Sequence, residues 1–133
     1  MASYVTDTHA LIWYLENDPR LGPNARIAFD SCDQGEAVIY IPTICLVEIV
    51  YLMEKGRIPS KMVTLLEEEL RAGTTGFMLA DLTLDVAKAV GAVIRGDIPD
   101  LPDRIIAATA LSLKVPLITR DKKIRLSGLK TIW

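Results

Sequence analysis

Histidine and cysteine, which supply the ligands of most zinc sites in proteins, are scarce in this sequence. It contains one histidine and two cysteines in 133 residues. The two cysteines, Cys32 and Cys45, lie 13 positions apart and form no CxxC pair. Neither a usual zinc site nor a disulfide framework is therefore expected.

An excess of basic residues is also missing. Fifteen Lys and Arg residues face seventeen Asp and Glu residues, for a net charge of -2. Bulk charge therefore cannot hold nucleic acid, and any such binding needs a local source of positive charge. The richest apolar run, residues 38–53, is interrupted by Pro42 and Glu48, and the first residues lack the basic, hydrophobic pattern expected of a leader. We expect no membrane span and a cytoplasmic location.

Apolar residues make up 50% of the chain and charged residues 24%, the composition of an ordinary globular protein. The length favours one domain over residues 1–133. Short β-prone segments alternate with helical patterns throughout, and this alternation predicts a parallel sheet with helices on both faces. The expected strands are 3–6, 37–41, 77–79, 115–119 and 130–133. The expected helices are 8–16, 23–34, 42–55, 59–73, 83–94 and 103–113.

Two acidic residues follow predicted strands. Asp7 comes directly after the first strand, and Asp121 lies two residues beyond Thr119, at the end of the fourth. In an open parallel sheet, ligands bind outside the carboxyl ends of the strands. Asp7 and Asp121 are therefore candidates for one shared site.

Two further acids stand in apolar surroundings. Glu48 is the only charged residue of the segment 43–53, where an unpaired buried carboxylate would be costly. It needs a cation, a metal ion or a water-filled cleft, although a buried ion pair is an alternative. Asp103 begins the apolar helix after Pro102. By itself it is most simply a first-turn acid favoured by the helix dipole, and Asp100 is a loop or cap residue.

Together, Asp7, Glu48, Asp103 and Asp121 come from four separate elements. Carboxylates repel one another, so a cluster of them persists when it binds a cation or shares protons. Oxygen ligands without His or Cys suit Mg²⁺ or Mn²⁺. Such an ion supports phosphate chemistry and would give an acidic protein a local positive charge for nucleic acid.

The segments around these four acids resemble the PIN-domain ribonucleases, and in particular the VapC-type toxins of VapBC toxin–antitoxin systems. The matching segments are 5–13, 42–49, 100–110 and 117–121. The resemblance implies a PIN-like three-layer α/β/α sandwich with a central, mostly parallel sheet. It implies an Mg²⁺- or Mn²⁺-dependent endoribonuclease that cleaves RNA phosphodiester bonds as a toxin. It also implies a VapB-like antitoxin partner and a homodimer, for which the apolar helices 44–51 and 62–70 offer surface.

Carried onto this chain, the resemblance makes Asp7, Glu48, Asp103 and Asp121 the metal-site acids. Thr119 could hold Asp121 or a metal-bound water through its hydroxyl, and Asp100 matches an extra acid found near some of these sites. Many relatives have a His-Arg pair before that acid, whereas this chain has Ile98 and Pro99. The basic candidates for RNA contact are Arg104, Arg120, Lys122 and Lys123.

Several of these residues also have purely structural explanations. Arg104 could instead pair with a carboxylate, and the basic segment 120–125 could be a solvated loop. His9 is better explained by helix-start packing than by metal binding, and Trp13 by the core. A Mg²⁺-dependent phosphatase or phospho-acceptor domain is a rival, although such domains carry a second acid near the first-strand Asp, where this chain has Thr8 and His9. A second alternative to the nuclease is a PIN-like RNA-binding module without catalytic activity.

Overall fold

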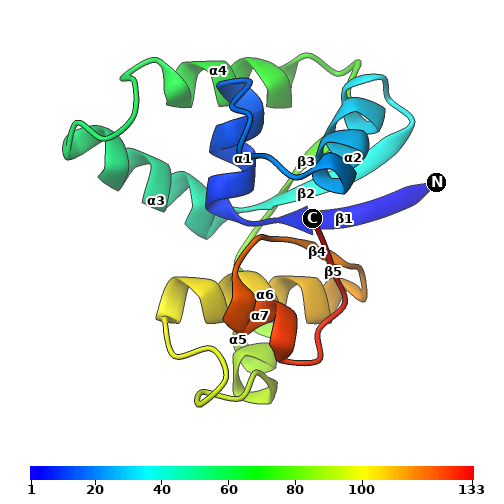
Figure 1. Cartoon of the computed structure of the whole chain (residues 1–133), viewed down its shortest axis with the longest axis vertical. Coiled ribbons are helices and arrows are strands. Elements are labelled where there is room, and N and C mark those ends of the chain that lie inside the picture. The colour runs from blue at the N-terminus through cyan, green and yellow to red at the C-terminus, as the bar shows by residue number, and fades with distance from the viewer.

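The core of the molecule is a sheet of five parallel strands in the order β3-β2-β1-β4-β5 (Figure 1). The computed structural model describes all residues, 1–133. The strands are β1 (Ala2–Thr6), β2 (Ala37–Pro42), β3 (Phe77–Ala80), β4 (Leu117–Ile118) and β5 (Thr131–Ile132). From β1 the chain builds one half of the sheet through β2 and β3, and later adds β4 and β5 on the other side. The order therefore reverses between β1 and β4, where open parallel sheets bind ligands.

Helices cover both faces of this sheet. Figure 1 shows α1 to α4 on one side and α5 to α7 on the other. The helices are α1 (Thr8–Leu15), α2 (Pro23–Asp33), α3 (Thr43–Glu54), α4 (Met62–Arg71), α5 (Leu84–Ala89), α6 (Leu101–Leu113) and α7 (Lys122–Leu126), with a 3₁₀ turn, η1 (Val90–Ala92), after α5. The predicted three-layer α/β/α sandwich is confirmed, and its sheet is wholly parallel. None of the helices combines the length and the apolar character needed to cross a bilayer.

Strands buried on both faces explain the continuous apolar runs of the sequence. Leu117 and Ile118, which point to opposite faces of β4, are both fully buried. Small residues of α6, among them Ala107 and Ala108, are also fully buried and let that helix approach the sheet closely. Twenty-seven buried apolar residues form one continuous cluster. This core holds the carboxyl ends of β1 and β4 in fixed positions.

Several segments differ from the prediction, and the helix expected over 59–73 spans 62–71. The helix expected over 83–94 ends at Ala89 and tightens into η1, in a stretch that contains the poor helix former Gly91. Helix α6 begins two residues earlier than expected, because the Asp100 side chain caps it and Pro102 occupies its first turn. Helix α7 was not predicted, because five residues are too few for a clear hydrophobic period.

Candidate active site

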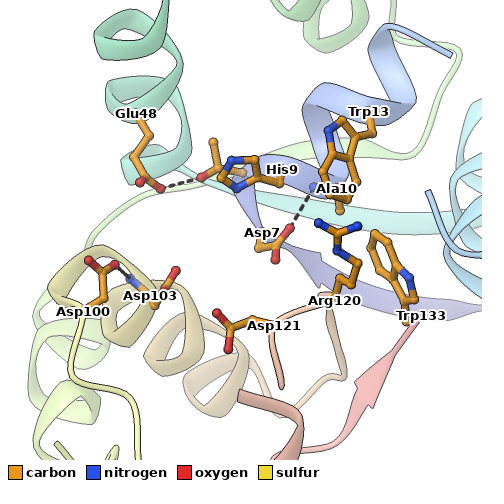
Figure 2. A pocket seen from close by; sticks show the side chains of 11 residues that line it. Asp7, His9, Ala10, Trp13, Glu48, Asp100, Asp103, Arg120, Asp121 and Trp133 are labelled. Atoms are coloured by element: carbon orange, nitrogen blue, oxygen red, sulfur yellow. Dashed lines mark hydrogen bonds between the residues drawn. The ribbon is translucent and has the colours of Figure 1, made fainter. Parts of the chain in front are cut away.

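A cavity of about 420 Å³ opens beyond the carboxyl ends of β1 and β4. Figure 2 shows its lining, to which α1, α3, α6 and the segment after β4 contribute. Five of its eleven lining residues are acids: Asp7, Glu48, Asp100, Asp103 and Asp121. The structure therefore brings together the four acids picked out as a site, with Asp100 beside them.

Three of these acids begin helices. The carboxylate of Asp7 accepts a hydrogen bond from the Ala10 amide at 2.9 Å at the start of α1. Asp100 accepts one from the Asp103 amide at 3.1 Å, at the start of α6. Asp121 caps α7 in the same way, through the Ile124 amide at 3.1 Å. The helix starts anchor the three carboxylates, and their unpaired N–H groups offset part of the negative charge.

Glu48 reaches the cavity from the middle of α3. Its carboxylate accepts a hydrogen bond of 2.5 Å from the hydroxyl of Thr8, a residue 40 positions away (Figure 2). This contact and the cavity explain how a charged residue is accommodated on an otherwise apolar helix. Thr8 lines the same cavity and was not singled out from the sequence. The sequence feature that could have pointed to Thr8 is its hydroxyl group directly after Asp7.

Burial and mutual repulsion raise the pKa of two site carboxyls. Burial is the main cause for Asp7, and Asp121 adds repulsion, while the Thr119 hydroxyl, the Ala10 amide and His9 act in the opposite direction on its pKa. The pKa of Asp103 is raised to about 7, first by burial and then by the charges of Asp100, Asp121, Glu48 and Asp7. Negative charge at this site is therefore only partly compensated by the protein itself.

Thr119 influences two of these acids. It is fully buried at the end of β4, and its hydroxyl oxygen accepts a hydrogen bond of 3.1 Å from the Asp121 amide. The same hydroxyl favours the charged form of Asp7 and so lowers its pKa. Thr119 thus fixes the backbone that carries Asp121 and favours the charged form of the other strand-end acid.

The donor atoms around the cavity fit a hard divalent cation. They are carboxylate oxygens, the ligands of Mg²⁺ and Mn²⁺, and after burial it is repulsion from the other acids that raises the pKa of Asp103. No three acidic, histidine or cysteine side chains stand close enough together to form a ready metal-binding group. The chemistry of the donors fits the ion, while the side chains face one another across open space (Figure 2).

The four basic residues expected to contact RNA lie in different places relative to the cavity. Arg120 lines the acidic cavity. Lys122 and Lys123 line an adjoining hollow of about 310 Å³ that shares Asp100, Asp103 and Asp121 with the cavity. Arg104 does not line either hollow: it donates hydrogen bonds of 3.0 and 3.2 Å to the carbonyl oxygens of Val90 and Val93. Its contacts give it a structural role in holding the turn around η1.

Aromatic residues form the remaining wall of the cavity. Trp13 lines it although only 5% exposed, so the prediction of a core residue holds in part. Trp133 stands edge-on to Trp13 at 5.8 Å, and His9 lies 5.8 Å from the same ring. Sequence reasoning missed Trp133, because no local pattern shows that the last residue returns to the end of β1.

The solved structures similar to this chain include toxin–antitoxin complexes. VapBC from Salmonella typhimurium bound to DNA has a TM-score of 0.71 at 20% identity, covering 99% of this chain and 98% of the other. VapBC2 from Rickettsia felis bound to a promoter fragment has a TM-score of 0.69 at 17% identity, covering 98% and 97%. A toxin–antitoxin complex from Klebsiella pneumoniae has a TM-score of 0.64 at 23% identity, covering 98% and 96%. At these identities the likeness establishes the fold alone.

No curated protein sequence matches the chain. The PIN domain family does match, over residues 4–127, a span that includes every acid of the cavity. Sequence match, sheet order and the strand-end position of the acids agree, and this chain belongs to the PIN domain family.

Proposed function

We propose that this protein is a divalent-metal-dependent endoribonuclease that acts as the toxin of a toxin–antitoxin pair. The observation that carries the proposal is the convergence of five carboxylates on one cavity beside the β1–β4 reversal. Such a site has the donor atoms for Mg²⁺ or Mn²⁺ and little else that could perform chemistry, since one His and no accessible Cys accompany it.

Asp7, Glu48, Asp103 and Asp121 are the residues that would hold the metal. When bound, it supplies positive charge against the phosphodiester and lowers the pKa of a water nucleophile. The chain's own contribution is placement. Asp7 and Asp121 are anchored by their helices, the Thr119 hydroxyl binds the Asp121 amide, and the Thr8 hydroxyl fixes Glu48. Carboxylates held in this way can orient a water and accept its proton near the phosphorus.

Cleavage of a single-stranded RNA labelled at one end tests the proposed activity. With Mg²⁺ or Mn²⁺ we expect internal cuts, and with EDTA none. Release of inorganic phosphate from a phosphomonoester, without internal cuts, would instead favour a phosphatase. RNA binding without any cleavage in either metal would favour an inactive module.

The proposed toxin role requires a protein inhibitor, a VapB-like antitoxin. Its chemistry follows from the cavity, because a basic side chain from a partner would offset the carboxylates as a metal does. We expect the inhibitor to lie along the groove beside α3 and α4 and to direct that side chain toward the acids. The test is growth arrest on expression of this chain, reversed by the adjacent small gene product. A complex that leaves the cavity open would contradict the proposed mode of inhibition.

We also propose a homodimer. Helix α3 exposes apolar side chains on its outer face, with Val47 61%, Tyr51 54% and Val50 45% exposed. The other helix considered for this role, α4, buries Met62 and Leu66 within the protein's own core. Helix α3 is therefore the better candidate surface. Light scattering should give twice the chain mass at micromolar concentration. A change of Val47 and Tyr51 to Asp should reduce the measured mass to that of a single chain.

A further inference from the structure

Two arginines lie against the same indole ring. The guanidinium carbon of Arg20 is 4.7 Å from the centre of the Trp13 ring, and that of Arg120 is 4.5 Å from it. Both distances fall within the range of cation–π attraction. Arg20 is near Trp13 in the sequence, whereas Arg120 is brought to the same tryptophan by the tertiary fold.

The two guanidiniums differ in what else they bind. Arg20 forms an ion pair with Asp18, with N–O distances of 2.8 and 3.1 Å, and this pair satisfies one edge of its guanidinium. Arg120 forms neither an ion pair nor a side-chain hydrogen bond, although it precedes Asp121 and lines the acidic cavity. Its N–H donors are therefore free at the edge of the site.

The surroundings of Trp13 make this placement stable. Trp13 is 5% exposed, and Trp133 packs against it edge-on at 5.8 Å. Trp133 in turn lies so close to Gly22 that a Cβ there would be 2.6 Å from its backbone and ring carbons. The indole is a fixed surface, and cation–π contact with it holds the Arg120 guanidinium without using its hydrogen-bond donors.

We infer that Arg120 is a substrate-positioning residue, which binds a backbone phosphate of the RNA next to the carboxylate cavity. This inference rests on the proposed nuclease function. A planar guanidinium with free donors binds the oxygens of a phosphate in two-point geometry. Lys122 and Lys123 stand beyond Asp121 on the adjoining hollow, so positive charge flanks the acids on two sides. A strand held at Arg120 would cross the acids toward these lysines.

Kinetics of Arg120→Ala and Arg20→Ala test the inference as a matched pair, because each removes one guanidinium from the same indole. We expect Arg120→Ala to raise KM for a single-stranded RNA about 10-fold or more, the scale of losing charge-assisted hydrogen bonds. Arg20→Ala should leave KM within about twofold. Arg120→Lys should restore part of the loss, since it returns the charge without the planar fork.

Binding measured without cleavage gives a second readout. In an Asp103→Asn background with Mg²⁺, the affinity for the same RNA should fall with salt. Adding Arg120→Ala should make the slope of log affinity against log salt shallower by about 0.7, the value for one phosphate contact on a single strand. Trp13→Phe keeps an apolar ring but weakens the stacking, and should raise KM by less than Arg120→Ala does. Thermal melting identifies any variant that fails to fold.

The outcomes separate this inference from the proposed function. If the parent cuts RNA but Arg120→Ala and Arg20→Ala share its KM, Arg120 does not position substrate while the nuclease function stands. If the parent binds RNA with an Arg120-dependent salt slope but never cuts it, the nuclease function fails and the positioning role stands. A parent that neither cuts nor binds RNA overturns both.

Discussion

Two hollows of similar size on this protein are lined by carboxylates, but only one resembles a reaction site. The cavity at the β1–β4 edge has a volume of about 420 Å³, and a groove between α1, α2 and α4 has about 450 Å³. The groove also presents four acids, which are Asp30, Asp33, Glu68 and Glu69. The number of acids does not distinguish the two places.

The position of the acids on the backbone distinguishes the cavity from the groove. The groove acids lie in the last turns of α2 and α4, where the helix dipole disfavours negative charge, and three of the four are exposed. Arg26 also lines the groove. In the cavity, by contrast, three acids cap helix starts beyond the strands, and Asp103 stands in a first turn. The fold therefore holds negative charge together at the cavity and leaves it to solvent at the groove.

The largest expected difference between the two regions is in activity. Asp103→Asn should lower RNA cleavage by ~10²-fold or more, because it removes a charge from a preorganised site. Asp33→Asn in the groove should leave the rate unchanged. Single-turnover cleavage assays measure both. Equal losses would show that general acidity, and not the position of the cavity, matters.

The second difference is the response to metal. Mg²⁺ or Mn²⁺ at 100 times its Kd should stabilise the folded protein by about 2.7 kcal/mol, because the ion binds only the folded state. The gain should shrink in Asp103→Asn and persist in Asp33→Asn. Thermal melting with and without metal checks this. A gain that survives Asp103→Asn would place the ion elsewhere.

The third difference is in stability, and it separates the helix-capping effect of an acid from the effect of its charge. Asp7→Ala removes the cap of α1 and should lower the free energy of unfolding by about 1 kcal/mol, whereas Asp7→Asn keeps a good cap and relieves repulsion. Asp7→Asn should therefore melt at or above the parent in metal-free buffer, and both variants should be inactive. Asp30→Ala, in the last turn of α2, should cause no loss of stability. Chemical denaturation gives the required values.

The effect that solvent screening reduces most is the pH dependence of stability. The pKa of Asp103 is raised from 3.8 to about 7, so the folded state binds this proton more tightly than the unfolded chain. Lowering the pH through 7 toward 4 should therefore stabilise the metal-free parent relative to Asp103→Asn. The slope cannot exceed about 1.4 kcal/mol per pH unit for one proton, and solvent screening makes it smaller.

A groove residue supplies the comparison for this pH effect. Burial, Asp33 and Glu68 also raise the pKa of Glu69. Glu69→Gln should therefore change the pH dependence in the same direction, but less. Urea titrations of the three proteins across this pH range provide the measurement. Parallel curves for parent and Asp103→Asn would contradict a shifted carboxyl at Asp103.

Much of the cavity was predictable because its acids carry local signals. Asp7 and Asp121 follow strands, and the carboxyl ends of parallel strands meet at one edge. Glu48 stands alone on an apolar helix, so it needed an opening or a partner. Asp100 was expected as a loop or cap residue, and it does cap α6. The position of Arg104 was not predictable, because its contacts with Val90 and Val93 depend on where η1 folds.

The sequence by itself determined the alternation of strands and helices, the apolar core and the acids at the strand ends, because periodicity and capping act over a few residues. Only the tertiary structure decided that Thr8 binds Glu48, that Trp133 packs on Gly22, and that Trp13 carries one paired and one free arginine. Except for those of Arg20, these contacts join residues far apart in the chain. They depend on strand order and helix packing, which no local spacing records.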